Sequence, residues 1–63
     1  MNHTEQLICD YLKSHGNEAL DVNCMSAIGA NPQSFDKALD SLERNNVIAV
    51  EDSEYIHRLI TLL

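Results

Sequence analysis

Residues 28–35 read IGANPQSF, a short stretch that lies between two segments of helical period. Gly29 can take the left-handed backbone conformation at low cost, so we expect it to end the first of these segments. Asn31 can cap a new helix, and Pro32 suits the first helical position because the amide that it lacks has no helical partner there. The stretch therefore predicts two helices that meet at a tight turn and cross at an angle.

The helix expected before this turn covers residues 22–28. Asp21 can accept hydrogen bonds from its free amides, so Asp21 is the predicted cap. The apolar side chains of its inner face are Cys24, Met25 and Ile28. A first helix is expected further back, from a cap at Asn2 to a stop at Gly16, and residues 19–20 between the two helices are short and apolar enough for a small strand.

The helix expected after the turn covers residues 32–44 and has a clear apolar stripe. The members of the stripe, which recur at helical spacing, are Phe35, Ala38, Leu39 and Leu42. Two asparagines, 45–46, end this helix because Asn tolerates the left-handed conformation. The period then changes: VIAV (47–50) and YIHRLI (55–60) are short and β-rich, and the polar EDSE (51–54) separates them. This pattern predicts a hairpin.

The order of these elements predicts an α+β fold with three helices and a C-terminal β-hairpin. The chain has 63 residues, so we expect a single domain over residues 1–63. Its composition is 44% hydrophobic and 22% charged, which is typical of a globular chain and excludes disorder.

The string that runs from residue 28 to 48, IGANPQSFDKALDSLERNNVI, resembles the second half of the N-terminal domain of bacterial repressors of the deoxyribose-operon type. Those domains have an apolar-Gly pair, an Asn-Pro or Ser-Pro helix start, a Leu-Glu-Arg helix end and an apolar pair that opens the wing. The positions that match are Ile28, Gly29, Pro32, Phe35, Leu39, Leu42, Glu43, Arg44, Val47 and Ile48. The resemblance implies a small winged helix-turn-helix, whose third helix enters the major groove of DNA in many relatives.

The segments LICDYLKSHG and DKALDSLER also resemble domains that bind left-handed Z-form nucleic acid. Those domains use Asn and Tyr on the third helix, nearby Lys or Arg, and a Trp in the wing. Here the matching helix positions hold Asp36 and Asp40, and the chain has no Trp. This second resemblance therefore implies a shared shape without the side chains that contact the nucleic acid.

The charge of the chain bears directly on its partners. Ten Asp and Glu stand against four Lys and Arg, a net charge of −6. Proteins that bind nucleic acid need several Lys or Arg against the phosphates, and anionic membrane surfaces attract the same residues. The whole supply is Lys13, Lys37, Arg44 and Arg58. On the third helix, Asp40 can pair with Arg44 and draw it away from a phosphate.

Two classes of function remain, and neither is an enzyme. The leading hypothesis is a regulatory module that contacts another protein, as an adaptor, an inhibitor or a nucleic-acid mimic. It would use the acidic side of the third helix and the acidic hairpin tip, namely Asp36, Asp40, Glu43, Glu51, Asp52 and Glu54. The alternative is a DNA-binding transcription regulator that acts as a dimer, with contacts from Gln33, Lys37 and Arg44.

The last strand carries more apolar side chains than so small a sheet is expected to hide. They are Tyr55, Ile56, Leu59, Ile60, Leu62 and Leu63. If this strand lies at the edge of the sheet, it can pair with a second copy of the chain and form a homodimer. The other interpretation is that these side chains close the core under the first helix.

No residue pattern indicates catalysis, a metal or a cofactor. Ser14 and His15 are adjacent, but neighbours on a helix point apart. The cysteines and histidines are scattered, with no Cys-x-x-Cys and no His-x-x-x-His. The candidate carboxylates lie on faces expected to be exposed, which is not the environment of a general acid or base.

The cellular setting is predicted to be the cytoplasm, with no membrane partner. No run of apolar residues is long enough to cross a bilayer, and the N-terminus MNHTEQ lacks the features of a signal peptide. Cys9 and Cys24 are then expected to be reduced. We interpret them as small core residues, with a redox or disulfide role as the alternative.

Overall fold

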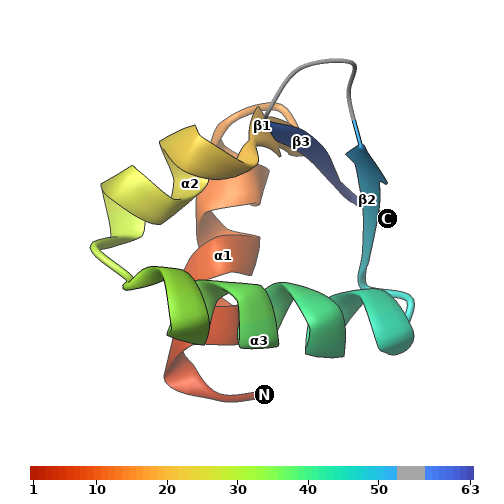
Figure 1. Ribbon diagram of the computed structural model, residues 1–63. Helices are drawn as coiled ribbons and strands as arrows, with labels where there is room; N and C mark the ends of the chain where they lie inside the picture. Colours follow the sequence, from red (N-terminus) through yellow and green to blue (C-terminus); the bar gives the residue numbers. More distant parts are fainter. Residues whose placement is uncertain (53–56) are drawn as a thin grey trace.

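The computed structural model describes residues 1–52 and 57–63 (Figure 1). Its elements, in chain order, are α1 (His3–Ser14), β1 (Glu18–Leu20), α2 (Asp21–Ile28), α3 (Pro32–Arg44), β2 (Ile48–Asp52) and β3 (Arg58–Leu62). This is a small α+β fold with three helices and a C-terminal antiparallel strand pair, as the sequence predicted. The arrangement is compatible with a winged helix-turn-helix.

The turn that decides the fold has the predicted geometry. Gly29 closes α2 with a φ of 70°, in the left-handed region. The side chain of Asn31 accepts a hydrogen bond of 2.9 Å from the backbone N–H of Ser34, and Pro32 is the first residue of α3. The same logic holds at the start of α1, where the Asn2 side chain accepts from the backbone N–H of Glu5 at 2.9 Å. Short-range signals therefore fix where these helices begin and end.

The predicted cap of α2 is wrong. Asp21 is the first residue of the helix, and the residue in the cap position is Leu20, whose side chain makes no capping bond. The Asp21 carboxylate accepts from the adjacent backbone N–H of Val22 at 2.7 Å, and its other oxygen is bound by Arg58. The side chain therefore keeps one hydrogen bond to a free amide of the helix, as expected, and adds a long-range partner on β3.

The sheet has the strand order β1-β3-β2, with β3 antiparallel to both neighbours. The prediction that the last strand lies at an edge is therefore wrong, since its backbone pairs on both sides. Ile60 is fully buried and Leu62 packs against the core, so both side chains serve the core. Leu59 is half-buried and Leu63 is 71% exposed, while Tyr55 and Ile56 lie outside the described residues.

The hairpin turn begins later than predicted. Glu51 and Asp52 are the last two residues of β2, paired with Leu59 and Arg58. Successive side chains of a strand point to opposite faces of the sheet. The two carboxylates therefore leave the sheet on different sides, and they do not form a hairpin tip as expected.

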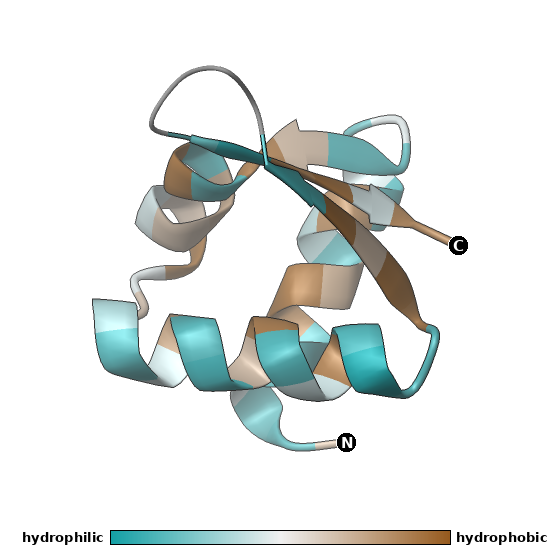
Figure 2. Ribbon diagram, turned by 45° about the vertical axis from the view of Figure 1, so that its right-hand side comes forward, coloured by the Kyte–Doolittle hydropathy of each residue, from teal (hydrophilic) through white to brown (hydrophobic). Residues whose placement is uncertain are grey.

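The core lies between the three helices and one face of the sheet. Its largest fully buried side chains are Ile8, Leu12, Cys24, Phe35, Leu39, Leu42, Ile48 and Ile60. All four members of the predicted α3 stripe are among the buried residues. Figure 2 shows the opposite character on the outward side of α3, which is mainly hydrophilic. Among the described residues, none of the helices combines the length and the apolar character that a membrane crossing needs.

Both cysteines are free thiols in this core. Burial raises the pKa of Cys24 to about 11, and burial also raises the pKa of Cys9. A thiol reagent attacks the thiolate, and at about pH 8 a pKa near 11 leaves about one thiol in a thousand ionised, against about a quarter for a free cysteine. We expect Cys24 in the folded chain to react with Ellman's reagent more than about 100-fold more slowly than in urea. Equal rates in the two states would contradict this placement.

Candidate functional site

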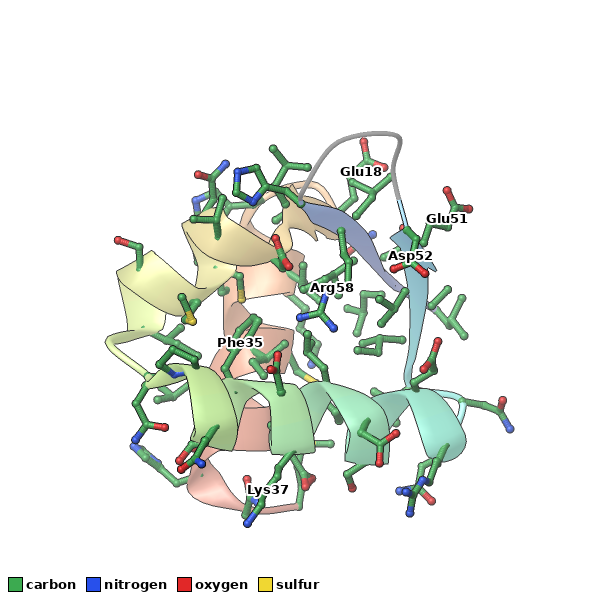
Figure 3. The ribbon with its side chains drawn as sticks, viewed as in Figure 1. Glu18, Phe35, Lys37, Glu51, Asp52 and Arg58 are labelled. Atoms are coloured by element: carbon green, nitrogen blue, oxygen red, sulfur yellow. The ribbon has the colours of Figure 1, made fainter. Side chains whose placement is uncertain are left out.

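The exposed side of α3 carries two parallel lines of side chains. Successive residues are about 100° apart around a helix, so residues at spacings of four and seven lie nearly in line along it. One line holds the carboxylates Asp36, Asp40 and Glu43, and the other holds Gln33, Lys37 and Arg44; all six are exposed. Figure 3 shows Lys37 on the side of α3 that is turned away from the sheet, while Arg58 reaches from β3 toward the helix. The carboxylate line therefore lies nearer to the sheet than the Lys37 line.

Arg58 joins three elements that are far apart in the sequence. Its Nε donates to Asp21 Oδ2 at 3.0 Å, and its Nη2 donates to Asp36 Oδ1 at 2.8 Å. Asp21 belongs to α2 and Asp36 to α3, so one guanidinium ties the start of β3 to both helices. We call these three side chains the Arg58 clasp.

The Arg58 clasp is partly shielded from water. The side chain of Asp21 is 14% exposed and that of Arg58 is 34% exposed, whereas that of Asp36 is 62% exposed. Burial alone raises the pKa of the Asp21 carboxyl, but the hydrogen bonds and the charge of Arg58, with the Val22 amide, outweigh burial and leave this pKa below its usual value. The hydrogen bonds to Asp36 and Asp21 in turn raise the pKa of the Arg58 guanidinium. Both groups are therefore held in their charged forms.

Arg44 is also paired. Its Nη2 lies 2.6 Å from Asp40 Oδ2, one helical turn away, which confirms the pairing expected from the sequence. Both side chains are exposed, so the pair is weak. Of the chain's four Lys and Arg, two therefore lie against carboxylates of α2 and α3; Lys13 and Lys37 are exposed.

A groove of about 250 Å³ opens beside the Arg58 clasp, between α2, the first turns of α3 and the start of β3. Its apolar lining consists of Val22, Met25, Pro32 and Phe35, and its polar lining consists of Asp21, Asp36, His57 and Arg58. The His57 Nδ1 lies 3.8 Å from Asp21 Oδ1. The lining side chains in the described ranges include no Ser, Thr, Cys or Lys.

The acidic side chains predicted to act together are divided between different faces. Asp36 and Asp40 each engage an arginine, and Glu43 continues their line on α3. Glu51 shares a row of the sheet with Leu59 and Leu20 on the face away from the core. Asp52 lies opposite Arg58 on the core-facing side, and Glu54 lies outside the described residues. The α3 line is thus the one part of the predicted acidic surface that the described residues hold together.

The Arg58 clasp was missed by reasoning from the sequence, although a signal exists. Side chains two residues apart on a strand share a face, so Arg58 lies on the same side as the buried Ile60. A charged residue at a core-facing position needs a partner of opposite charge. The pattern therefore calls for a carboxylate near Arg58, but it does not say which of the ten Asp and Glu provides it.

No protein-family model matches this chain, and neither a curated protein nor a solved structure does. Within residues 1–52 and 57–63, no group of three or more His, Cys, Asp and Glu side chains is placed to hold a metal ion. The surface chemistry of α3 and its surroundings is therefore what bears on function, because a fold by itself does not imply an activity.

Proposed function

We propose that this chain is a non-enzymatic winged-helix regulatory module that binds another protein through the line of carboxylates on α3. We call this line, which consists of Asp36, Asp40 and Glu43, the acidic line. The observation that supports this most is the pairing of arginines with carboxylates on the helix that many relatives place against DNA. Arg44 lies on Asp40, and Arg58 lies between Asp21 and Asp36. A basic surface on the partner suits a face where carboxylates outnumber uncommitted cations.

The magnitudes favour a protein partner over DNA. The exposed Arg44–Asp40 pair is worth at most about 1 kcal/mol, so a phosphate could recruit Arg44 at little cost. The recruitment would still leave the Asp40 carboxylate beside the phosphate, and like charges at about 4 Å repel by about 1 kcal/mol even in water. Proteins that bind DNA through six to ten phosphate contacts rely on a far larger supply of cations. The partner is either a protein that the module binds as an adaptor or inhibitor, or a protein whose nucleic-acid-binding site the module occupies as a mimic.

The proposal is tested with two matched double variants. In the first, Asp40→Asn and Glu43→Gln remove the charge of two exposed carboxylates without changing their shape. In the second, Gln33→Ala and Lys37→Ala alter the neighbouring line of the same helix. The wild type and each variant are expressed in cells and cross-linked to the proteins that they bind. Mass spectrometry then compares the proteins recovered with each.

We expect a specific partner to be cross-linked by the wild type and by the Gln33/Lys37 variant, and its recovery to fall about tenfold or more in the Asp40/Glu43 variant. Removing two interfacial charges costs about 1–2 kcal/mol of binding free energy in total, and this loss corresponds to about a tenfold weaker affinity. The opposite pattern, with loss only in the Gln33/Lys37 variant, would contradict an acidic binding face.

The alternative proposal is a DNA-binding transcription regulator that gains affinity by dimerising. It is favoured by the exposure of Gln33, Lys37 and Arg44 along one line of α3, with Lys37 directed away from the sheet (Figure 3). Arg and Lys that contact bases or phosphates each contribute to the affinity. In that case, the Lys37→Ala and Arg44→Ala double variant abolishes binding to duplex DNA, whereas unchanged affinity removes these residues from the contact.

A further inference from the structure

The groove beside the Arg58 clasp is large enough for one side chain. Pockets that bind drug-sized ligands have volumes of roughly 300–1,000 Å³, and a cavity of about 150 Å³ is enough for benzene. The groove, at about 250 Å³, lies between these sizes. Its volume therefore suits one large apolar side chain that enters from outside.

The lining of the groove is suited to such a side chain. Phe35 forms a fully buried part of the wall, while Val22 and Met25 are half-buried and Pro32 is exposed. Methionine is unbranched and flexible, so it adapts to partners of different shape. Arg58 extends from β3 toward α3 on the same side of the molecule as Phe35 (Figure 3).

The charge around the groove indicates what should flank that side chain. Two carboxylates of the lining, Asp21 and Asp36, stand against the single guanidinium of Arg58. A carboxylate accepts about four hydrogen bonds, and Asp36 remains 62% exposed although it binds Arg58. Asp36 is also the first member of the acidic line that continues along α3 through Asp40 and Glu43.

We propose that the groove receives one apolar side chain of a basic segment of the partner protein, with the flanking Lys or Arg of that segment on Asp36 and the acidic line. The inference rests on the proposed protein-binding function and adds the site that gives it specificity. Charge alone would accept many basic chains, whereas the groove selects those that carry a large apolar residue between their cations.

The test is a titration of the full chain, followed by amide chemical shifts, with three capped peptides. The first is acetyl-KKLKK-amide, the second replaces its Leu with Gly, and the third, acetyl-EELEE-amide, reverses its charges. We expect KKLKK to shift the amides of Val22 and Met25 as well as those of the acidic line. KKGKK should shift only the acidic line, and EELEE should shift neither.

A matched variant separates the groove from the charge. Met25→Gln keeps a side chain of similar length and makes the groove wall polar. We expect this variant to bind KKLKK about 5- to 10-fold more weakly than the wild type does, and KKGKK equally well, because about 1–1.4 kcal/mol of apolar contact is lost. If the variant does not fold, the comparison of the three peptides on the wild type decides the question alone.

The outcomes distinguish the groove from the wider proposal. Identical shift patterns for KKLKK and KKGKK, confined to the acidic line, would overturn the groove and leave the protein-binding function standing. An absence of shifts with both basic peptides would overturn the groove and count against an acidic binding face as well.

Discussion

Replacing Phe35 with alanine is expected to leave a large part of the chain unfolded in water at room temperature. Phe35 is 1% exposed and is the largest fully buried side chain of the core, where it joins α3 to the other helices. Truncation of a buried Phe to Ala typically costs about 3–5 kcal/mol, because both apolar contact and packing volume are lost. At about 0.05–0.15 kcal/mol per residue, a chain of 63 residues has about 3–9 kcal/mol of stability in total.

The measurement is urea unfolding followed by far-ultraviolet circular dichroism. Phe35→Leu is the matched control, since it keeps an apolar side chain and should cost only about 1–1.5 kcal/mol. The expected order of stability is wild type, then Phe35→Leu, then Phe35→Ala. A Phe35→Ala chain with the urea midpoint of the wild type would show that α3 does not pack as described.

Replacing Arg58 with methionine is expected to destabilise the chain by about 1–2 kcal/mol at neutral pH. Methionine keeps an unbranched apolar stem and removes the charge, so the change isolates the Arg58 clasp from simple packing. Hydrogen bonds to charged groups contribute about 1.5–3 kcal/mol when shielded, and the exposure of Asp36 reduces this figure. Arg44→Met is the matched control, because its exposed pair with Asp40 should contribute at most about 0.5 kcal/mol.

The contribution of the Arg58 clasp should depend on pH in one direction. The pKa of Asp21 is lowered in the folded chain by Arg58 in spite of burial, so the folded state binds its proton less readily than the unfolded state does. The stabilisation is therefore fully present above the unfolded pKa of about 3.9 and is lost as pH falls through the lower folded pKa. We expect the difference in unfolding free energy between wild type and Arg58→Met to be constant from about pH 7 to 5 and to shrink below about pH 4. A difference that grows in acid, or a larger effect of Arg44→Met, would contradict this electrostatic role.

The parts of the structure that follow from neighbouring residues could be predicted from the sequence. Gly29 and Asn31 act within one turn of helix, and the α3 stripe repeats every three or four residues, so each signal is complete within a short window. The central position of β3 in the sheet does not follow from neighbouring residues. Its pairing with the three residues of β1 depends on contacts between residues about 40 positions apart, which no local pattern specifies.

The candidate site shows the same division. The pairing of Arg44 with Asp40 spans one helical turn and was predicted, whereas the contacts of Arg58 span 22 and 37 residues and were not. The polar run EDSE predicts a turn that includes Glu51 and Asp52, but pairing with Leu59 and Arg58 extends β2 over both residues. Tertiary contacts override a weak local preference in both cases.

The central proposal is that the side of α3 has too little free positive charge to bind a polyanion. The most direct test is fluorescence anisotropy of a short random-sequence DNA duplex titrated with the wild-type chain at about 50 mM salt, where electrostatic binding is strongest. We expect a Kd weaker than about 10⁻⁴ M, which is a lower affinity than non-specific DNA-binding proteins typically have. A Kd tighter than about 10⁻⁶ M that Lys37→Ala and Arg44→Ala together abolish would contradict the proposal and establish α3 as a DNA-binding helix.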